Sequence, residues 1–363
     1  MERVIKHFLD RGVRPTVSTC TRIDVTRRLT ARPRAASRAA SRTMSLSRAR
    51  LASFLVFISA VARSARAFTV HGYIPEYRPT SIAADACEGA RARVLAFSAT
   101  PNARGDGLDG LDAVPRRPTE RGSAGRACAW DLVVGGGGRS DGFRRLRGNV
   151  DALAIEVARA VKDGGYDGVS YDWEYPMNDD EWETYGRLLR RTRERLDEGA
   201  AVSFAVHVSP ETFDAIEKFK LTDVVDWVHL MTYDSGFPSG HASLEFVRAV
   251  LQYLKSTKRD ASKFTLGIPF YARSVRNPGD VKTYEELRRD ATKTFDVAVN
   301  RVGDYAFDSV SDVREKVRLA QEHGFAGVMA WELGQDVQPA TREDSLLRAI
   351  ADEVAKSNAR DEL

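Results

Sequence analysis

Eight short runs rich in β-branched and aromatic residues alternate along this 363-residue chain with segments of helical periodicity. Such alternation is typical of a parallel sheet wrapped by helices. A barrel of eight βα units needs about 250 residues, and the chain from residue 68 onward supplies somewhat more. We therefore expect an α/β fold, a (β/α)8 TIM barrel over residues 68–356 with only a short insertion between strands seven and eight. The expected strands are 68–73, 93–99, 130–136, 167–174, 201–209, 224–234, 263–273 and 325–332.

The run DGVSYDWEYP at 167–176 contains two carboxylates with an informative spacing. Alternate side chains of a strand share a face, so Asp172 and Glu174 point the same way as Ser170. Residues two apart lie about 7 Å from each other, close enough for two carboxyl groups to couple their titrations. A protonated carboxyl beside an ionised one is what general-acid cleavage of a glycosidic bond requires. The alternative is a solvated strand end, which the aromatic and apolar neighbours disfavour.

Further polar and aromatic side chains follow the expected strands 224–234, 263–273 and 325–332. Barrels of this kind keep their chemistry at the C-terminal ends of the strands. Each side chain alone has an ordinary structural explanation, such as core packing or an ion pair, but their joint position favours a carbohydrate site. The candidate substrate-binding residues are Met231, Asp234, Arg273 and Trp331, with Tyr73 and Phe97 from the first two strands.

Several motifs in register resemble the chitinase-like glycoside hydrolases of family 18. Residues 167–174 resemble the D-G-x-D-x-D-x-E signature of that family, and MTYD at 231–234 is similar to its sixth-strand motif. GIPFYAR at 267–273, GVMAWELGQD at 327–336 and the glycine-rich VVGGGGRSDGF at 133–143 are similar to strands seven, eight and three. The resemblance covers nearly everything from residue 68 to about residue 336.

The resemblance implies retaining hydrolysis of β-1,4-linked N-acetylglucosamine glycans, namely chitin and its oligosaccharides, assisted by the substrate. Glu174 would protonate the leaving oxygen, while the substrate's own 2-acetamido oxygen attacks the anomeric carbon. Asp172 would hydrogen-bond the acetamido N–H and stabilise the oxazolinium ion, and Tyr233 would orient the acetamido oxygen. The other residues implied are Asp234 and Arg273, which would position hydroxyls or acids, and Trp331, which would floor the subsite. No metal and no cofactor is expected, and the sequence has no histidine cluster typical of a metal site.

The chain departs from the family pattern at two positions. The family's first inner acid is Ser170 here, and the serine of its strand-three motif corresponds to Val133. Loss of an inner acid removes a negative charge and should lower the proton affinity of Asp172. We expect a working site with a shifted pH profile. Between strands seven and eight, residues 274–311 offer only a short helix at 284–289 and a hairpin through 295–307, which predicts an open cleft.

Two alternatives stay open. One is a non-catalytic lectin of the same fold, which the presence of Glu174 disfavours and Ser170 keeps open. The other is an endo-β-N-acetylglucosaminidase acting on the core of N-glycans. The sequence does not separate chitin from N-glycan substrates, or endo from exo action.

The first 67 residues differ in composition from the rest of the chain. They contain 15 of the chain's 55 Lys and Arg but only 3 of its 51 Asp and Glu, so the remainder carries 40 basic and 48 acidic residues. Because the remainder is mildly acidic, no nucleic-acid partner is expected. Residues 44–67 have the basic start, apolar core and small-residue end of a secretory signal peptide, with an apolar run too short for a membrane span. Residues 1–43 are interpreted as a basic extension, either transit-like or from a mis-assigned start.

The C-terminal residues 357–363 end in RDEL, which resembles the address for return to the endoplasmic reticulum. We therefore expect the lumen of the endoplasmic reticulum, with its retrieval receptor as a partner, or alternatively secretion. In an oxidising lumen Cys87 and Cys128 could form one disulfide. The other expected partner is a glycan that contains N-acetylglucosamine.

Overall fold

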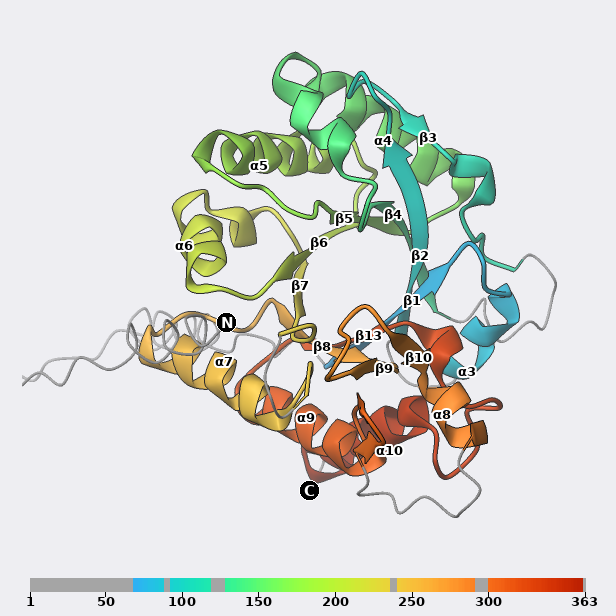
Figure 1. The fold of residues 1–363 in the computed structure, drawn as a ribbon. Helices are drawn as coiled ribbons and strands as arrows, with labels where there is room; N and C mark the ends of the chain where they lie inside the picture. The colour runs from blue at the N-terminus through green and yellow to red at the C-terminus, as the bar shows by residue number, and fades with distance from the viewer. Residues whose placement is uncertain (1–67, 88–91, 119–127, 236–239, 291–299, 362–363) are drawn as a thin grey trace, which may run out of the picture. The chain divides into compact units, whose positions relative to one another are not determined.

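The eight expected strands close into a barrel in the computed structural model, which describes residues 68–87, 92–118, 128–235, 240–290 and 300–361. Figure 1 shows the strands as a ring with the helices outside it. The parallel order β1-β13-β8-β7-β6-β5-β4-β2 returns to its start because β1 also pairs with β2. The (β/α)8 prediction is therefore confirmed. The barrel strands are β1 (Thr69–Pro75), β2 (Ala92–Pro101), β4 (Ala129–Gly135), β5 (Gly168–Asp172), β6 (Ala201–His207), β7 (Trp227–Met231), β8 (Phe264–Pro269) and β13 (Gly327–Trp331); the short β3 (Leu108–Asp109) pairs antiparallel with β2.

The helices begin and end at residues suited to those positions. The Asn178 side chain accepts from the backbone N–H of Glu181, and Ser309 and Asp312 form a reciprocal capping box. Gly165 ends its helix with a φ of 67°, a left-handed conformation that favours glycine. The α-helices are α3 (Ala83–Cys87), α4 (Val150–Gly164), α5 (Asp179–Arg193), α6 (Pro210–Lys218), α7 (Leu244–Ser256), α8 (Tyr284–Asp290), α9 (Val310–Glu322) and α10 (Leu346–Asp361). The 3-10 turns are η1 (Thr80–Ile82), η2 (Leu111–Ala113), η4 (Asp141–Gly148), η5 (Leu221–Asp223) and η6 (Leu333–Gln335).

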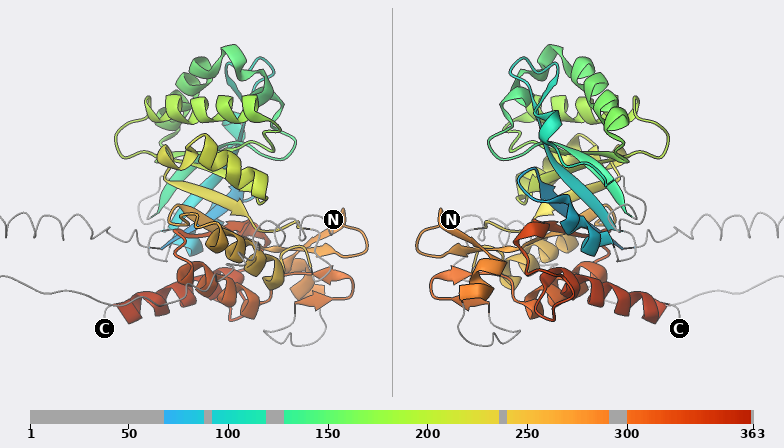
Figure 2. Two further views of the ribbon diagram at one scale, coloured as in Figure 1. Left: turned by 90° about the vertical axis from the view of Figure 1, so that its left-hand side faces the viewer. Right: turned by 90° about the vertical axis from the view of Figure 1, so that its right-hand side faces the viewer.

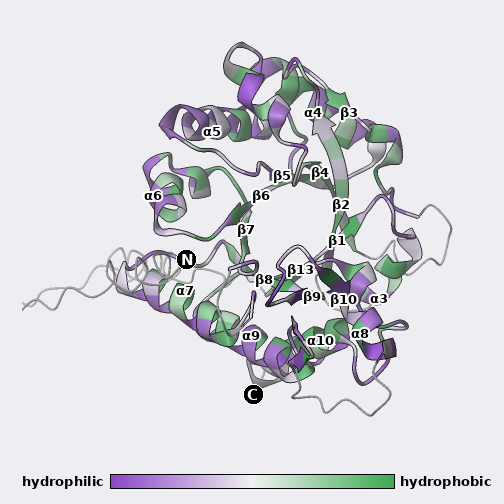
Figure 3. Cartoon of the chain, in the orientation of Figure 1, coloured by the Kyte–Doolittle hydropathy of each residue, from purple (hydrophilic) through white to green (hydrophobic). Residues whose placement is uncertain are grey.

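Apolar residues are buried on both faces of the barrel sheet. Outward-facing strand residues pack under the helices, which carry both apolar and polar residues (Figure 3). A smaller cluster fills the interior, where Leu95, Val133 and Met329 meet the aromatic rings of Tyr73 and Phe97. The interior is therefore a packed core whose upper end provides aromatic surface.

The seventh expected strand is interrupted. The prediction of one continuous strand over 263–273 is wrong, because β8 ends at Pro269 and β9 (Tyr271–Ser274) joins a different sheet. The switch occurs at Phe270, whose N–H donates to the Trp331 carbonyl while its own carbonyl accepts from the N–H of Tyr284. Figure 2 shows the strands of this second sheet in orange, to one side of the barrel strands. Its strand order is β10 (Val281–Thr283), β9, β12 (Tyr305–Ala306) and β11 (Arg301–Val302).

The insertion is short, as predicted, but it is folded. The expected helix at 284–289 is α8, and the second half of the expected hairpin is the β11–β12 pair. The first part of that hairpin, 295–299, lies outside the described residues. The small sheet is attached to the rim of the barrel through Phe270, which connects β8 to β9 and hydrogen-bonds the Trp331 carbonyl.

A disulfide joins Cys87 to Cys128, whose Cα atoms lie 5.2 Å apart. These residues come shortly before the starts of β2 and β4, so the bond lies at the N-terminal end of the barrel. The pairing considered from the sequence is therefore present.

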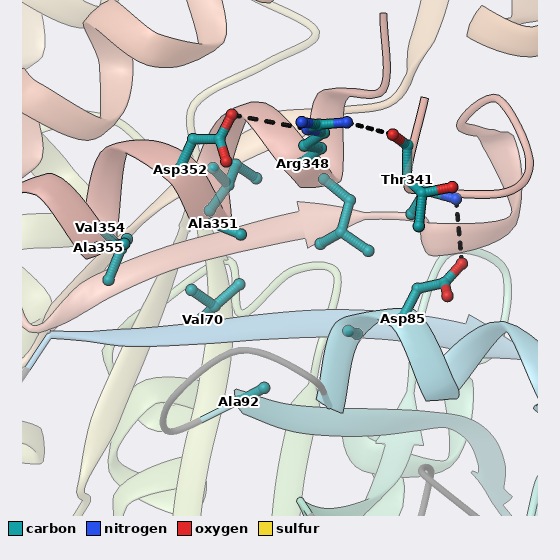
Figure 4. A pocket seen from close by; sticks show the side chains of 13 residues that line it. Val70, Asp85, Ala92, Thr341, Arg348, Ala351, Asp352, Val354 and Ala355 are labelled. Atoms are coloured by element: carbon teal, nitrogen blue, oxygen red, sulfur yellow. Dashed lines mark hydrogen bonds and ion pairs between the residues drawn. The ribbon is translucent and has the colours of Figure 1, made fainter. Parts of the chain in front are cut away.

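A groove of about 580 Å³ lies between α10 and the first strands (Figure 4). The helix between β1 and β2, α3, has only five residues and contributes Asp85 and Ala86 to the lining. The groove lining also includes Val70, Ala92 and a face of α10 that contains Ile350 and Val354. Within the described part of the chain, no helix has the length and apolarity needed to cross a lipid bilayer. The predicted leader at 1–67 and the last two residues of RDEL lie outside the described residues.

Candidate active site

A pocket of about 340 Å³ opens at the C-terminal ends of the barrel strands. It collects residues from β1, β2, β5, β6, β7, β9 and β13 and from the loops that follow them. Eight of the nine predicted site residues line it; Arg273 does not. The lining residues are Tyr73, Phe97, Gly137, Arg139, Asp172, Glu174, Tyr175, His207, Met231, Tyr233, Asp234, Tyr271 and Trp331.

The two carboxylates of the central motif lie in this pocket at different depths. Asp172 is buried at the last residue of β5, and Glu174 follows two residues later and is half-buried. Burial, and then the charge of Glu174, raise the pKa of Asp172 well above its usual value. Burial also raises the pKa of Glu174, with a further rise from the charge of Asp234. The pair is therefore suited to share a proton that an exposed carboxyl would lose.

The glycine-rich loop after β4 holds the end of β5. The N–H of Gly136 donates to the Asp172 carbonyl at 2.7 Å, and a Cβ atom at Gly136, where φ is 112°, would overlap the Phe97 ring. The Ser140 hydroxyl accepts from the backbone N–H of Glu174 at 2.9 Å. The N–H of Gly137 donates to the Glu174 carboxylate. Glycine at these positions therefore lets backbone groups approach and orient the acid.

The two departures from the family pattern are neighbours in space. Val133 pairs with Ser170 in the parallel register of β4 and β5, and both side chains are fully buried. The Tyr73 side chain lies next to Ser170. Within the described residues, the hydroxyls of Ser170 and Tyr73 have no well-formed hydrogen bond. The same holds for the Oδ1 atom of Asp172. The space below Asp172 is therefore lined by neutral groups.

Asp234 is the centre of a hydrogen-bond cluster on the other side of the pocket. Its Oδ1 atom accepts from the Tyr271 hydroxyl at 2.8 Å, from Arg273 Nε at 2.7 Å and from His241 Nδ1 at 3.1 Å. Burial opposes ionisation, but these donors together hold the pKa of Asp234 below its usual value. Arg273 therefore contributes through Asp234, without lining the pocket itself.

Aromatic rings form the floor. The Trp331 ring packs against Tyr73 at 5.0 Å and against Phe97 at 4.9 Å between centroids. The Tyr233 hydroxyl has one hydrogen bond within the described residues, to the weak acceptor Met329 Sδ at 3.9 Å. This hydroxyl is therefore available to a stronger acceptor.

Five residues of the pocket are not among the predicted site residues, namely Gly137, Arg139, Tyr175, His207 and Tyr271. Arg139 pairs with Glu76, donates to the Ser98 hydroxyl at 2.9 Å and lies over the Phe97 ring. Tyr175 donates to Glu174, and its ring meets His207 at 4.5 Å. His207 ends β6, so the rule on strand ends could have found it. Tyr175 directly follows the acid, whereas nothing in the sequence around Arg139 indicated its ion pair.

The described residues contain no group of three or more His, Cys, Asp or Glu side chains arranged to hold a metal ion.

A family model described as "Glycosyl hydrolases family 18" matches residues 130–336. "Endochitinase 1" of Metarhizium robertsii is 27% identical over 243 residues, which cover 53% of this chain and 56% of that protein. "Class V chitinase" of Arabidopsis thaliana is 25% identical over 244 residues, covering 50% of this chain and 61% of the relative. The chain thus spans little more than half the length of the curated relatives it matches.

Solved structures share the fold at lower identity. A chitinase from Rhizomucor miehei superposes with a TM-score of 0.62 at 21% identity, covering 78% of this chain and 99% of the other. A chitinase-like agglutinin from Robinia pseudoacacia superposes with a TM-score of 0.63 at 18% identity and the same coverage. Proteins titled chitinase and agglutinin therefore share this barrel, so function must be argued from the site.

Proposed function

The chain belongs to family 18 of the glycosyl hydrolases, and from this premise we propose that it hydrolyses β-1,4-linked N-acetylglucosamine glycans with retention of configuration. One observation carries the proposal: Glu174 lies in the pocket with a raised pKa, two residues after the buried Asp172. A general acid must hold its proton at working pH, and burial next to other carboxylates provides that property.

The nucleophile is the substrate's own 2-acetamido oxygen. As it attacks the anomeric carbon, the glycosidic bond breaks and Glu174 gives its proton to the leaving oxygen. Asp172 accepts from the acetamido N–H and stabilises the positive charge of the oxazolinium ion. The Tyr233 hydroxyl, whose described partner is a weak acceptor, donates to the acetamido oxygen and keeps it in line. A water molecule that gives its proton to Glu174 then attacks the anomeric carbon. This attack opens the oxazolinium ring and restores the acetamido group.

The floor of the pocket supports a pyranose substrate. The half-buried Trp331 lies beside Tyr73 and Phe97, which hold the indole in place. Because the acetamido group is the nucleophile, the sugar on the non-leaving side must be N-acetylglucosamine. Chitin oligosaccharides and the chitobiose core of N-glycans both satisfy this requirement.

The test uses residues 68–363 with chitotetraose and, separately, a high-mannose glycopeptide, followed by mass spectrometry. A Glu174→Gln variant keeps the shape of the acid and removes its proton. Cleavage of either substrate by the parent protein that disappears in this variant would establish the hydrolase. The substrate that is cut would distinguish action on chitin from action on N-glycans.

A second candidate function is glycan binding without turnover, because an agglutinin shares this fold. Glu174 argues against it, whereas the neutral Ser170 below Asp172 is the feature in its favour. Binding of chitotetraose without cleavage at any pH from 4 to 8 would favour this candidate over the hydrolase.

We further propose that the protein acts in the lumen of the endoplasmic reticulum. The proposal is supported by the leader composition at 44–67 and by the RDEL sequence at 360–363. Fluorescence microscopy of the full chain with an internal tag, compared with a variant in which Leu363 is followed by two glycines, tests it. Loss of luminal retention is expected in the extended variant, and equal distributions would contradict retrieval.

A further inference from the structure

His241 does not line the substrate pocket, but it contacts Asp234, which does. Its Nδ1 atom lies 3.1 Å from Asp234 Oδ1, and its ring packs on Tyr271 at 4.8 Å between centroids. Asp234 itself has a φ of 56°, an uncommon conformation for a residue other than glycine. Such conformations persist where surrounding contacts enforce them. His241 is one of those contacts.

The backbone carbonyls of His241 and of the next residue are anchored by hydrogen bonds. The His241 carbonyl accepts from the N–H of Ser235 at 3.0 Å and from its hydroxyl at 2.9 Å. The next carbonyl, of Ala242, accepts from Lys316 Nζ at 2.6 Å. Lys316 is fully buried and forms an ion pair with Asp308. These contacts leave the ring little freedom to leave Asp234.

A second cavity, of about 210 Å³, lies behind His241. His241 lines it together with Glu245, Asn300, Asp308 and Asp312. The Nε2 atom of His241 is buried and has no hydrogen-bond partner among the residues that the structure describes. His241 therefore lies between Asp234, which lines the substrate pocket, and a separate polar cavity.

We propose that His241 is a positioning residue for the hydrolysis: by donating from Nδ1 to Asp234, it keeps that carboxylate ionised and turned toward the substrate pocket. This inference rests on the proposed function. The charged and titratable groups that face His241 are Asp234 and Tyr271 and, across the second cavity, Glu245, Asp312 and Asp308 with its partner Lys316.

The consequence reaches the acid through charge. The charge of Asp234 contributes to the raised pKa of Glu174. Burial raises the pKa of Asp234, whereas the hydrogen bond from His241 lowers it. Removing this hydrogen bond should therefore raise the pKa of Asp234. Asp234 would then take up a proton at a higher pH and stop assisting Glu174. The rate should fall on the acid side of the pH profile.

Two variants separate positioning from packing. His241→Phe keeps a ring against Tyr271 but cannot donate, whereas His241→Asn places an amide donor near the position of Nδ1. With chitotetraose, we expect His241→Phe to lose about tenfold or more in kcat/KM at pH 5 and less at pH 7. His241→Asn should recover most of that loss although its side chain does not titrate. Equal profiles for the two variants, or an unchanged profile for His241→Phe, would overturn the proposal.

A spectroscopic arm is independent of turnover. In the parent protein, ¹⁵N NMR of the imidazole should show a proton on Nδ1, and a proton on Nε2 alone would refute the inference without any variant. The ¹³C signal of the Asp234 carboxyl should titrate at higher pH in His241→Phe than in the parent protein. If the parent protein cleaves no glycan, the proposed function fails, while these two spectra still decide what His241 does to Asp234.

Discussion

Replacing Ser170 with aspartate would put a second carboxyl on the inner face of β5, two residues before Asp172. The new side chain would be fully buried, as Ser170 is, with Val133 opposite it on β4 and the Tyr73 hydroxyl nearby. The Tyr73 hydroxyl is free of a well-formed hydrogen bond within the described residues, so it can donate to the new carboxylate. The variant therefore adds charge with one donor to meet it.

The size of the effect follows from the spacing on the strand. Two charges about 7 Å apart in a medium of effective dielectric constant about 20 interact with roughly 2.4 kcal/mol, or about 1.7 pKa units. The new negative charge raises the pKa of Asp172, which must be ionised to stabilise the oxazolinium ion. The acid limb of the kcat/KM profile should therefore move to higher pH by about one to two units. The basic limb, which reports ionisation of the more distant Glu174, should move less.

The assay is hydrolysis of chitotetraose from pH 4 to pH 8 by the parent protein, Ser170→Asp and Ser170→Asn. The asparagine variant has the shape of the aspartate without its charge and should leave the acid limb in place. Val133→Ser combined with Ser170→Asp adds a hydroxyl beside the carboxylate and should unfold at a higher temperature than Ser170→Asp alone. An acid limb that stays in place in Ser170→Asp, or moves equally in Ser170→Asn, would refute the electrostatic reasoning.

Three further predictions concern stability. Lys316→Met leaves Asp308 buried without its partner and should lower the free energy of unfolding, measured in urea at pH 7, by about 3–5 kcal/mol. Adding Asp308→Asn to the same chain should reduce this loss. Burial, and then the charge of Arg93, lower the pKa of His229 from 6.5 to about 3, so the unfolded chain binds more protons in that interval. Stability should thus fall by up to about 1.4 kcal/mol per pH unit below pH 6.5, and an equal slope in His229→Gln would contradict this account. Reduction of the bond between Cys87 and Cys128, which are 41 residues apart, should cost about 2–4 kcal/mol by calorimetry, with an alanine pair as the control.

Local patterns were sufficient to predict the barrel and the central carboxylates. The alternation around Asp172 and Glu174 depends only on strand geometry, and the structure places both side chains in one pocket. The change of sheet at Phe270 could not be predicted in this way. Within the segment 263–273, Pro269 is a local sign of an interruption, but the move of β9 to another sheet depends on strands from 281–306 that pair with it. That pairing is a tertiary property.

Contacts between residues far apart in the sequence could not be predicted either. The ion pair between Arg139 and Glu76 joins residues 63 positions apart, and either residue alone looks like an ordinary surface charge. His241 lies only seven residues after Asp234, yet no local sequence pattern indicated that the two side chains are in contact. The strand-end rule, applied to every strand, would have identified His207. The resemblance pointed to the expected residues, and the geometry added those that hold them.

The disulfide and the pocket lie at opposite ends of the same strands. Cys87 and Cys128 precede β2 and β4, whereas Phe97 and Arg139 line the pocket near or beyond the other ends of these strands. Mutations that alter glycan preference and mutations that alter the stability given by the disulfide therefore fall on separate sets of loops. Natural variation in one set can accumulate without compensation in the other. New loops can likewise be introduced at the C-terminal end of the barrel while the disulfide at its N-terminal end is retained.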